Sequence, residues 1–287
     1  MFVADLVESL LAVGHQVIVA SFETVQPSGS AELRASRGAA AGRAWADAIS
    51  VMDATSTPRS WGARVPVARL PVARTWGAGT GIDELERIAR HREVLEAFGR
   101  SLDARWPIDV VHAHTGAPDG LAATGLADAL GIGLLVSEHD STLPRRLAAD
   151  PRLVAAYRGL VDAGRRRMVA AVSPALGDKI GTLLDAPVPA VLPNPIRLDA
   201  FAVGAAIRRD PNELLWVGTR AEHKGTAILL EAFAAVHREH PDWHLRLIGP
   251  AAGGGDDRWI EQAADLGVGE ATSFEPATDR AAVAAAM

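Results

Sequence analysis

Hydrophobic residues follow helical and strand spacing in turn from the start of the chain. Apolar residues at positions 3, 6, 7, 10 and 11 recur with the period of a helix, and Gly14 follows where helices commonly end on glycine. The β-branched run at 17–19 then predicts a strand. Because a parallel α/β sheet normally begins with a strand, a chain that begins with a helix predicts that the first strand of the sheet is missing.

The next part of the chain has a weaker pattern. Residues 22–64 show no sustained period, which predicts a loop that carries a short helix and no functional residue. The segment 65–72 predicts an edge strand, because its two prolines cannot donate hydrogen bonds to a neighbouring strand. A long amphipathic helix is predicted over 83–105, followed by a buried strand at 108–112.

Helices and strands then alternate regularly in two series. The first is predicted as a helix at 119–130, a strand at 134–137, helices around 143–166, a strand at 168–172, a helix at 174–184 and a strand at 190–192. The second is predicted as strands at 213–217, 244–248 and 271–274, with helices at 224–239, 256–266 and 278–286. Strands separated by helices of roughly 10 to 15 residues indicate parallel βαβ units.

A polar, irregular stretch at 195–212 separates the two series and predicts a linker between two domains. We therefore predict the α/β class, with two Rossmann-like parallel-sheet lobes at 1–194 and 213–287 and a ligand cleft between them. The length of 287 residues agrees with two domains. A doubly wound lobe usually has more than three strands, so the second lobe, like the first, is expected to be incomplete.

Composition narrows the possible functions. Hydrophobic residues make up 48% and charged residues 22%, which is ordinary for a globular protein. A net charge of −6 without a long basic run argues against nucleic acid as a partner. The absence of cysteine excludes disulfides, thiolate catalysis and cysteine-bound zinc. No apolar run is long enough to cross a membrane, and the N-terminal residues do not resemble a signal peptide, so a cytoplasmic location is expected.

The first candidate site is the segment 216–225, where a buried strand ends and a helix begins. Ligands of open α/β sheets bind at the carboxyl ends of the strands, and a helix N-terminus attracts anions. This location favours a diphosphate, with Arg220 binding phosphate oxygens through its planar guanidinium and Lys224 contributing a compact positive charge. The alternative is a solvated loop in which Glu222 and Lys224 pair with each other.

A second candidate site combines three histidines. His112 and His114 end one predicted strand, and His139 follows the next, so adjacent parallel strands are expected to bring the three together facing the cleft. One alternative is a metal centre, but the spacing matches no familiar ligand pattern. Another alternative is that His112 or His114 is a buried, hydrogen-bonded core histidine.

A third candidate site lies near the end of the first lobe. Ser173 follows a predicted strand, and Asn194 lies between two prolines, so that its amide is held on a stiff turn where it can contact a ligand. An ordinary turn asparagine is the alternative. The glycines at 253–255 do not form a dinucleotide-binding fingerprint after a strand.

The order and spacing of these segments resemble the GT-B retaining glycosyltransferases of family 4. The resemblance is carried by Gly14-His15-Gln16-Val17, His112-Ala113-His114, Glu138-His139-Asp140, Val172-Ser173, Pro193-Asn194 and the segment from Val217-Gly218 to Lys224-Gly225. It implies transfer of a hexose from a UDP- or GDP-sugar to a hydroxyl of an unidentified acceptor, with retention. It also implies that neither a metal nor a further cofactor is required.

The resemblance also implies roles for particular residues. The family has a G-R-x-x-x-x-K loop on the donor diphosphate, in which Lys224 matches the lysine, Thr219 stands at the arginine position and Arg220 follows one residue later. Catalytic roles are implied for His139, Lys224 and Arg220. The implied donor-binding residues are Gly218, Thr219, Lys224, Asn194, Gly249, Pro250 and Phe274, and the implied acceptor-side residues are His112, His114 and Ser173.

Two family segments are expected outside the sequence: a glycine-rich loop before Met1 and an E-x7-E segment after Met287. Losing one preorganised donor lowers a rate by about 10² to 10³, so these segments bear on activity. Two alternatives to the transferase therefore remain. One is another GT-B catalyst, such as a sugar-nucleotide epimerase, and the other is a non-catalytic fragment or binding module, which Thr219 at the arginine position also favours.

Overall fold

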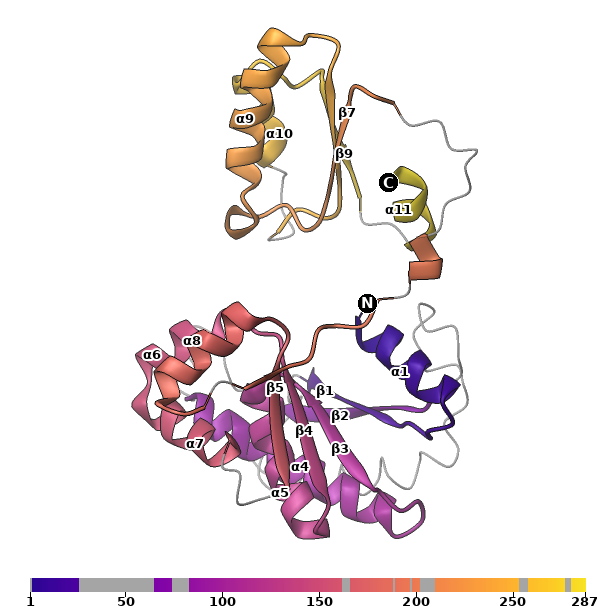
Figure 1. Ribbon diagram of the computed structural model, residues 1–287, viewed down its shortest axis with the longest axis vertical. Helices are drawn as coiled ribbons and strands as arrows, with labels where there is room; N and C mark the ends of the chain where they lie inside the picture. Colours follow the sequence, from indigo (N-terminus) through magenta and orange to yellow (C-terminus); the bar gives the residue numbers. More distant parts are fainter. Residues whose placement is uncertain are drawn as a thin grey trace. The chain divides into compact units, whose positions relative to one another are not determined.

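The chain forms two compact units, Met1–Pro195 and Ile196–Met287, which are described separately (Figure 1). The computed structural model describes residues 2–25, 65–73, 83–161, 166–187, 189–196, 198–201, 210–252, 258–276 and 280–287. Most of the predicted loop at 22–64, part of the predicted linker and the glycines at 253–255 lie outside the described residues.

The N-terminal unit begins with helix α1 (Phe2–Ala12) and a two-stranded parallel sheet of β1 (Val19–Val25) and β2 (Val67–Ala73). Gly14 has φ 91°, the left-handed conformation expected of a glycine that ends a helix. The strand predicted at 17–19 instead begins at Val19 and continues to Val25, into the predicted loop. Residue-by-residue pairing with β2, from Val19 opposite Val67 onward, extends it, and such long-range pairing is invisible in the local pattern.

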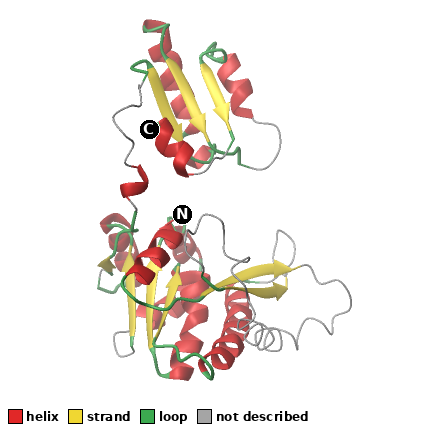
Figure 2. Ribbon diagram, turned by 90° about the vertical axis from the view of Figure 1, so that its right-hand side faces the viewer, coloured by secondary structure: helices red, strands yellow, loops and turns green. Residues whose placement is uncertain are grey.

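A second parallel sheet of the N-terminal unit has the order β3-β4-β5-β6. Its strands are among those drawn in yellow in Figure 2. Its strands are β3 (Val110–His114), β4 (Gly133–Glu138), β5 (Arg167–Ala171) and β6 (Ala190–Val191). The connecting helices are α4 (Glu84–Asp103), α5 (Leu121–Leu130), α6 (Leu143–Ala149), α7 (Pro151–Val161) and α8 (Pro174–Leu184). This arrangement is the predicted series of βαβ units.

Local signals in the sequence set the ends of these helices. Asp83 caps α4 by accepting a hydrogen bond of 2.8 Å from the Glu86 amide, and Gly131 ends α5 in the left-handed conformation. Apolar residues of α4, α5, α6, α7 and α8 then pack with those of the strands into one core. Its fully buried large side chains are Leu70, Leu143, Leu147, Leu153, Tyr157, Leu160, Ile180 and Leu184.

The C-terminal unit is a three-stranded parallel sheet in the order β7-β8-β9 with helices on both faces. Its strands are β7 (Glu213–Val217), β8 (His244–Ile248) and β9 (Thr272–Glu275). In Figure 1, α9 (Thr226–Glu239) and α10 (Arg258–Asp265) cover one face and α11 (Arg280–Ala286) lies on the other. The core between sheet and helices contains Leu230, Phe233, Leu245, Leu247 and Trp259.

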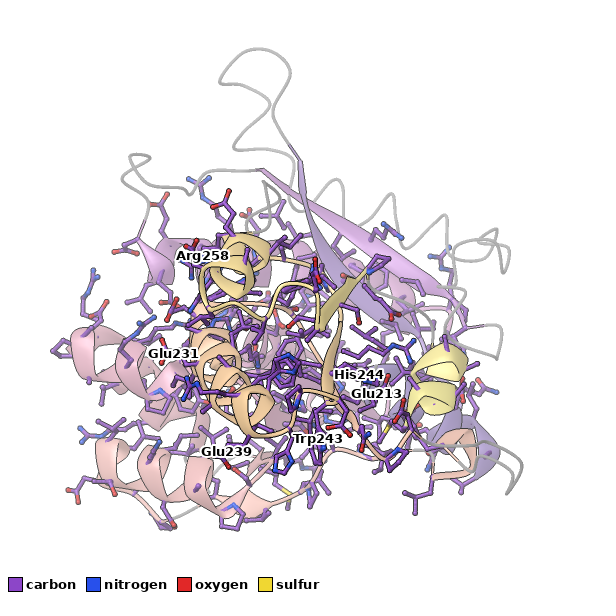
Figure 3. The ribbon with its side chains drawn as sticks, turned by 90° about the horizontal axis from the view of Figure 1, so that it is seen from above. Glu213, Glu231, Glu239, Trp243, His244 and Arg258 are labelled. Carbon is purple, nitrogen blue, oxygen red and sulfur yellow. The ribbon has the colours of Figure 1, made fainter. Side chains whose placement is uncertain are left out.

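Polar side chains meet at the amino ends of β7 and β8. His244 lies with its Nε2 3.5 Å from the Glu213 carboxylate and 3.7 Å from that of Asp210 (Figure 3). The short helix η3 (Leu198–Phe201) precedes this sheet in the chain. The candidate residues of this unit lie at the opposite, carboxyl edge of the sheet.

The pH dependence of stability is expected to depend on His91 of α4. Its ring stacks on Phe22 with 4.1 Å between centroids, and burial, with a smaller contribution from Arg87, lowers its pKa from 6.5 to about 4. The unfolded chain therefore takes up this proton at a higher pH than the folded chain. The free energy of unfolding therefore decreases as the pH falls from about 6.5 through about 4. At pH 5 the loss due to His91 is about 2 kcal/mol relative to pH 8.

His91→Phe is expected to remove this contribution while keeping an aromatic ring against Phe22. Urea unfolding at pH 8 and at about pH 5 should then show a smaller loss of stability in the variant than in the wild type. The exposed His15→Phe serves as the control and should leave the pH dependence as it is. An equal pH dependence in wild type and His91→Phe would contradict the assignment.

Candidate active site

The three histidines singled out in the sequence lie together at the carboxyl ends of β3 and β4. His112 Nε2 lies 2.8 Å from Ser137 Oγ, and His114 Nδ1 lies 3.0 Å from His139 Nε2. The His114 ring is 4.5 Å from the His112 ring and 5.3 Å from the His139 ring, measured between centroids. The register places His114 opposite Ser137 and His112 opposite Leu135, so the cluster extends over the last residues of β3 and the end of β4.

Burial decides the charge of this cluster. It lowers the pKa of all three rings, and the pKa of His114 falls to about 4 because His112 and His139 also disfavour its positive charge. The rings are therefore neutral near pH 7, and in the His114–His139 pair one ring donates its N–H to the other. In the described part of the chain, no group of three or more His, Asp or Glu residues is arranged to hold a metal.

His112 fits the structural alternative considered for one of the pair. Its ring is half-buried and hydrogen-bonded to Ser137, whose side chain is buried. His114 is instead bonded to His139, which is the residue implied to lie near the transferred sugar. The acceptor-side roles of His112 and His114 stay predictions.

Glu138, the last residue of β4, belongs to the Glu138-His139-Asp140 segment singled out in the sequence, but no role was predicted for its side chain. Its side chain is fully buried and accepts hydrogen bonds from the Gly116 amide at 2.7 Å, from the Asp140 amide at 2.8 Å and from the Tyr157 hydroxyl. Burial raises its pKa, and these three donors oppose the shift. The available signals were an acidic residue ending an apolar strand and a single tyrosine in the whole chain.

The connection from β3 to α5 differs from the prediction. The helix predicted from 119 begins at Leu121, after an irregular turn at Gly116–Gly120 in which Ala117 is non-helical (φ −130°, ψ 119°), and Thr115 before it has φ 84°. Glu138 binds the Gly116 amide here, and the Thr115 amide donates to the Ser137 carbonyl at 2.8 Å. Gly116 is needed because a Cβ there would lie 1.9 Å from the Tyr157 hydroxyl oxygen.

Ser173 and Asn194 lie at the carboxyl side of β5 and β6. The Ser173 hydroxyl caps α8 by accepting a hydrogen bond of 3.3 Å from the Leu176 amide, which is a structural use of the side chain. Asn194 is partly buried in the stretch that ends the N-terminal unit. Their predicted acceptor and donor contacts stay predictions.

In the C-terminal unit, the loop from β7 to α9 is tied to the neighbouring strand. The Gly218 amide donates to the Ile248 carbonyl at 2.9 Å, and the Arg220 amide donates to the Pro250 carbonyl at 2.8 Å. A short 3₁₀ turn, η4 (Glu222–Lys224), follows, and α9 begins at Thr226, so the helix predicted from 224 starts two residues later. The loop therefore has a fixed path into the first turn of α9.

The Arg220 side chain points into the unit. It is 6% exposed, and its Nη1 donates to the carbonyls of Gly249 and of Glu275, the latter at 3.0 Å. Its guanidinium carbon also lies 5.5 Å from the centre of the Phe274 ring. Arg220 thus joins the carboxyl ends of β8 and β9, and its predicted contact with a diphosphate stays a prediction.

Two glycines bring the ends of β7 and β8 into backbone contact. Gly249 has φ 142°, and a Cβ at this position would lie 1.8 Å from the Gly218 carbonyl oxygen. The Gly249 amide also donates to the Glu275 carbonyl at 3.0 Å. The predicted donor-binding residues Gly218, Gly249, Pro250 and Phe274 therefore lie at one edge of the sheet, although their contact with a donor stays a prediction.

Lys224 is exposed, and Glu222, the acid considered as its ion-pair partner, pairs with another residue. The Glu222 carboxylate lies 2.6 Å from Arg258 of α10, which is labelled in Figure 3. The alternative in which Glu222 and Lys224 pair with each other is therefore wrong. Lys224 forms no ion pair with any other residue that the structure describes.

Two models of known protein families match the chain. A family model described as a glycosyl transferase 4-like domain matches residues 1–195, and one described as glycosyl transferases group 1 matches residues 201–287. The chain belongs to the glycosyltransferases. It is a sugar-nucleotide-dependent enzyme of the GT-B fold, and the alternatives of an epimerase and a non-catalytic module are not favoured.

Solved structures share this fold. The crystal structure of Anabaena HepE in complex with UDP and glucose aligns with a TM-score of 0.56 at 15% identity, over 94% of this chain and 72% of HepE. A glycosyltransferase from Rickettsia africae ESF-5 aligns with a TM-score of 0.53 at 12% identity, over 92% of this chain and 69% of its own. A search of curated protein sequences gives no match. Among the described helices, none has the length and apolar character of a membrane span.

Arg220→Met is expected to destabilise the C-terminal unit, because it keeps an apolar stem but removes the guanidinium donor from the Gly249 and Glu275 carbonyls, of which Glu275 keeps the Gly249 amide. Hydrogen bonds to charged groups contribute roughly 2 to 3 kcal/mol, which is the expected loss of unfolding free energy. Urea unfolding followed by tryptophan fluorescence measures it. Arg238→Met, at an exposed position of α9, is the matched control. Equal stability of the two variants would show that Arg220 does not hold the strand ends.

Proposed function

We propose that this glycosyltransferase moves a hexosyl group from a UDP- or GDP-sugar to an acceptor hydroxyl, with retention at the anomeric carbon. The observation that carries the proposal is Lys224, an exposed cation that follows the carboxyl end of β7 immediately before α9. The complex of HepE with UDP and glucose supports a nucleoside diphosphate as the group that binds this loop.

Lys224 has the properties that a diphosphate site requires. A lysine ammonium is a compact point charge, and the first turn of a helix adds N–H groups and the positive end of the helix dipole. The turn is also held in place, because the Thr226 hydroxyl accepts from the Ala221 amide at 3.0 Å and donates to the Ala221 carbonyl at 3.1 Å. A cation on a fixed loop stabilises the charge of a departing diphosphate without reorganisation.

His139 is the proposed catalytic contribution of the N-terminal unit. Its ring is neutral near pH 7 because burial lowers its pKa, so it is suited to hydrogen bonding with a sugar or acceptor hydroxyl rather than to carrying a charge. The pairing with His114 leaves His139 Nδ1 as the ring nitrogen directed away from that bond. We assign His139 to the transferred sugar and Lys224 to the diphosphate.

Calorimetric titration with UDP and with GDP tests the diphosphate assignment. Lys224→Ala is expected to weaken binding of the preferred nucleotide by roughly 10- to 100-fold, because one charge-assisted contact is lost. The chain has one other lysine, Lys179, which is exposed on α8, so Lys179→Ala is the matched control. Equal affinity in the wild type and Lys224→Ala would refute the assignment.

Because the chain has two lysines, NMR can also detect nucleotide binding directly at the Lys224 ammonium group. Reductive methylation with ¹³C-formaldehyde labels Lys179, Lys224 and the α-amino group, and Lys224→Ala identifies the Lys224 resonance. UDP is expected to shift that resonance and to leave the Lys179 resonance in place. A shift of the Lys179 resonance alone would also refute the assignment.

Turnover is expected to proceed without a divalent metal, since Lys224 and the start of α9 supply the positive charge that a metal supplies in other transferases. Release of UDP or GDP from a sugar nucleotide, measured with EDTA and with added Mg²⁺, checks this expectation. Equal rates agree with it. A rate that disappears in EDTA and returns with Mg²⁺ would contradict it.

A further inference from the structure

We propose that Glu138 is a positioning residue, whose buried carboxylate holds the His114–His139 pair in register by tying together the chain segments that follow β3 and β4. Its effect on turnover rests on the role proposed for His139, whereas its effect on the geometry of the pair does not. The proposal follows from where the hydrogen-bond donors of Glu138 come from.

The three donors belong to three different parts of the N-terminal unit. The Gly116 amide follows β3, the Asp140 amide follows β4, and the Tyr157 hydroxyl comes from α7. Two of the donors lie on segments that flank the histidines: Gly116 is two residues after His114, and Asp140 is next to His139. One carboxylate therefore fixes both ends of the pair against the same helix.

Arg146 of α6 makes a second tie between the same two segments. Its guanidinium lies 2.5 Å from the Asp140 carboxylate and donates to the Ala117 carbonyl at 3.1 Å. A further ion pair joins Arg146 to Glu84 at the start of α4. The segments after β3 and β4 are thus joined by two side chains, the buried Glu138 carboxylate and the half-buried Arg146 guanidinium.

The fold alone does not explain an acid at position 138. The residues around it form an apolar core, where a carboxylate loses solvation unless every acceptor is satisfied. Replacing buried charged groups by well-packed apolar residues is often neutral or stabilising. A carboxylate with three donors, facing the only tyrosine of the chain, is instead suited to specifying one arrangement of the groups that donate to it.

The histidine pair is a contact that needs such control. A single N–H···N bond of 3.0 Å joins His114 and His139, so a small displacement of either segment breaks it and changes which ring nitrogen of His139 carries the proton. Misplacement of a reacting group by about 1 Å lowers rates by about 10²-fold. Thr115, held with a positive φ between His114 and Gly116, shows that this segment keeps a conformation that its own sequence disfavours.

Glu138→Gln tests the proposal, because it keeps the shape of the side chain and replaces one acceptor by a donor. Histidine ring ¹⁵N spectra, recorded as a function of pH on the full chain, report the tautomer and titration midpoint of each ring. In the wild type, His114 is expected to titrate near pH 4. In Glu138→Gln, the His114 and His139 midpoints are expected to rise toward 6.5, because the loosened segments admit water.

Tyr157→Phe provides a second variant that removes one donor and leaves the carboxylate in place. It is expected to shift the same two midpoints in the same direction, by less than Glu138→Gln. Ile180→Val, a fully buried position on α8, is the control for stability alone: it is expected to lower stability by an ordinary core truncation and to leave the His114 and His139 spectra unchanged. Unchanged midpoints in both Glu138→Gln and Tyr157→Phe would overturn the proposal.

Kinetics separate this proposal from the proposed function. With the preferred sugar nucleotide as donor and water as acceptor, Glu138→Gln is expected to lower kcat by about 10- to 100-fold and to leave KM for the donor unchanged. A shift in the histidine spectra with an unchanged kcat would support the positioning role and refute the role of His139 in transfer. A rise in KM with an unchanged kcat and unchanged spectra would overturn the positioning role.

Discussion

A buried charge that satisfies backbone groups at the ends of neighbouring strands is the constraint on which both candidate sites depend. In the N-terminal unit the charge is the Glu138 carboxylate, which accepts from backbone amides that follow β3 and β4. In the C-terminal unit it is the Arg220 guanidinium, which donates to the Gly249 and Glu275 carbonyls beside the ends of β8 and β9. The two units meet the same requirement with opposite charges.

This requirement comes from the geometry of parallel sheets. Where a strand ends, its amide and carbonyl groups lose their ladder partners, and buried groups of this kind must find others. The carboxyl edge is also where ligands bind, so the chain there cannot simply be regular. A side chain that reaches two strand ends satisfies the backbone beside the candidate residues: His114 and His139 near Glu138, and the loop that leads to Lys224 near Arg220.

The sequence predicts those features that local spacing determines. The bounds predicted for α8, β7 and β8 are those of the structure, because proline, serine and apolar runs mark them locally. The meeting of His112, His114 and His139 was also predictable, because adjacent parallel strands align their carboxyl ends. By contrast, the extension of β1 to Val25 depends on its pairing with β2, in which each residue faces one 48 positions later in the chain.

The unpredicted part of the sites has the same long-range origin. Nothing near Glu138 in the sequence reveals that Tyr157 donates to its carboxylate. Likewise, nothing near Arg220 reveals that its guanidinium donates to the backbone carbonyl of Glu275, which is 55 residues distant. The delayed start of α5 is a consequence of the same contacts, since Gly116 is held by Glu138 before the helix can begin. Residues that organise a site are therefore harder to find from sequence than residues that end a strand or helix beside it.

The use of the two basic side chains at the C-terminal edge follows from their chemistry. Only two of the 29 lysine and arginine residues are lysines, yet the exposed cation just before α9 is Lys224, while Arg220, four residues earlier in the loop, is buried. The planar fork of an arginine can donate to two carbonyls at once and keeps its charge when buried. A lysine keeps its charge in water on a flexible stem and can follow a phosphate group as it departs. Arginine thus organises this edge of the sheet, and the exposed lysine is the side chain that we propose for the ligand.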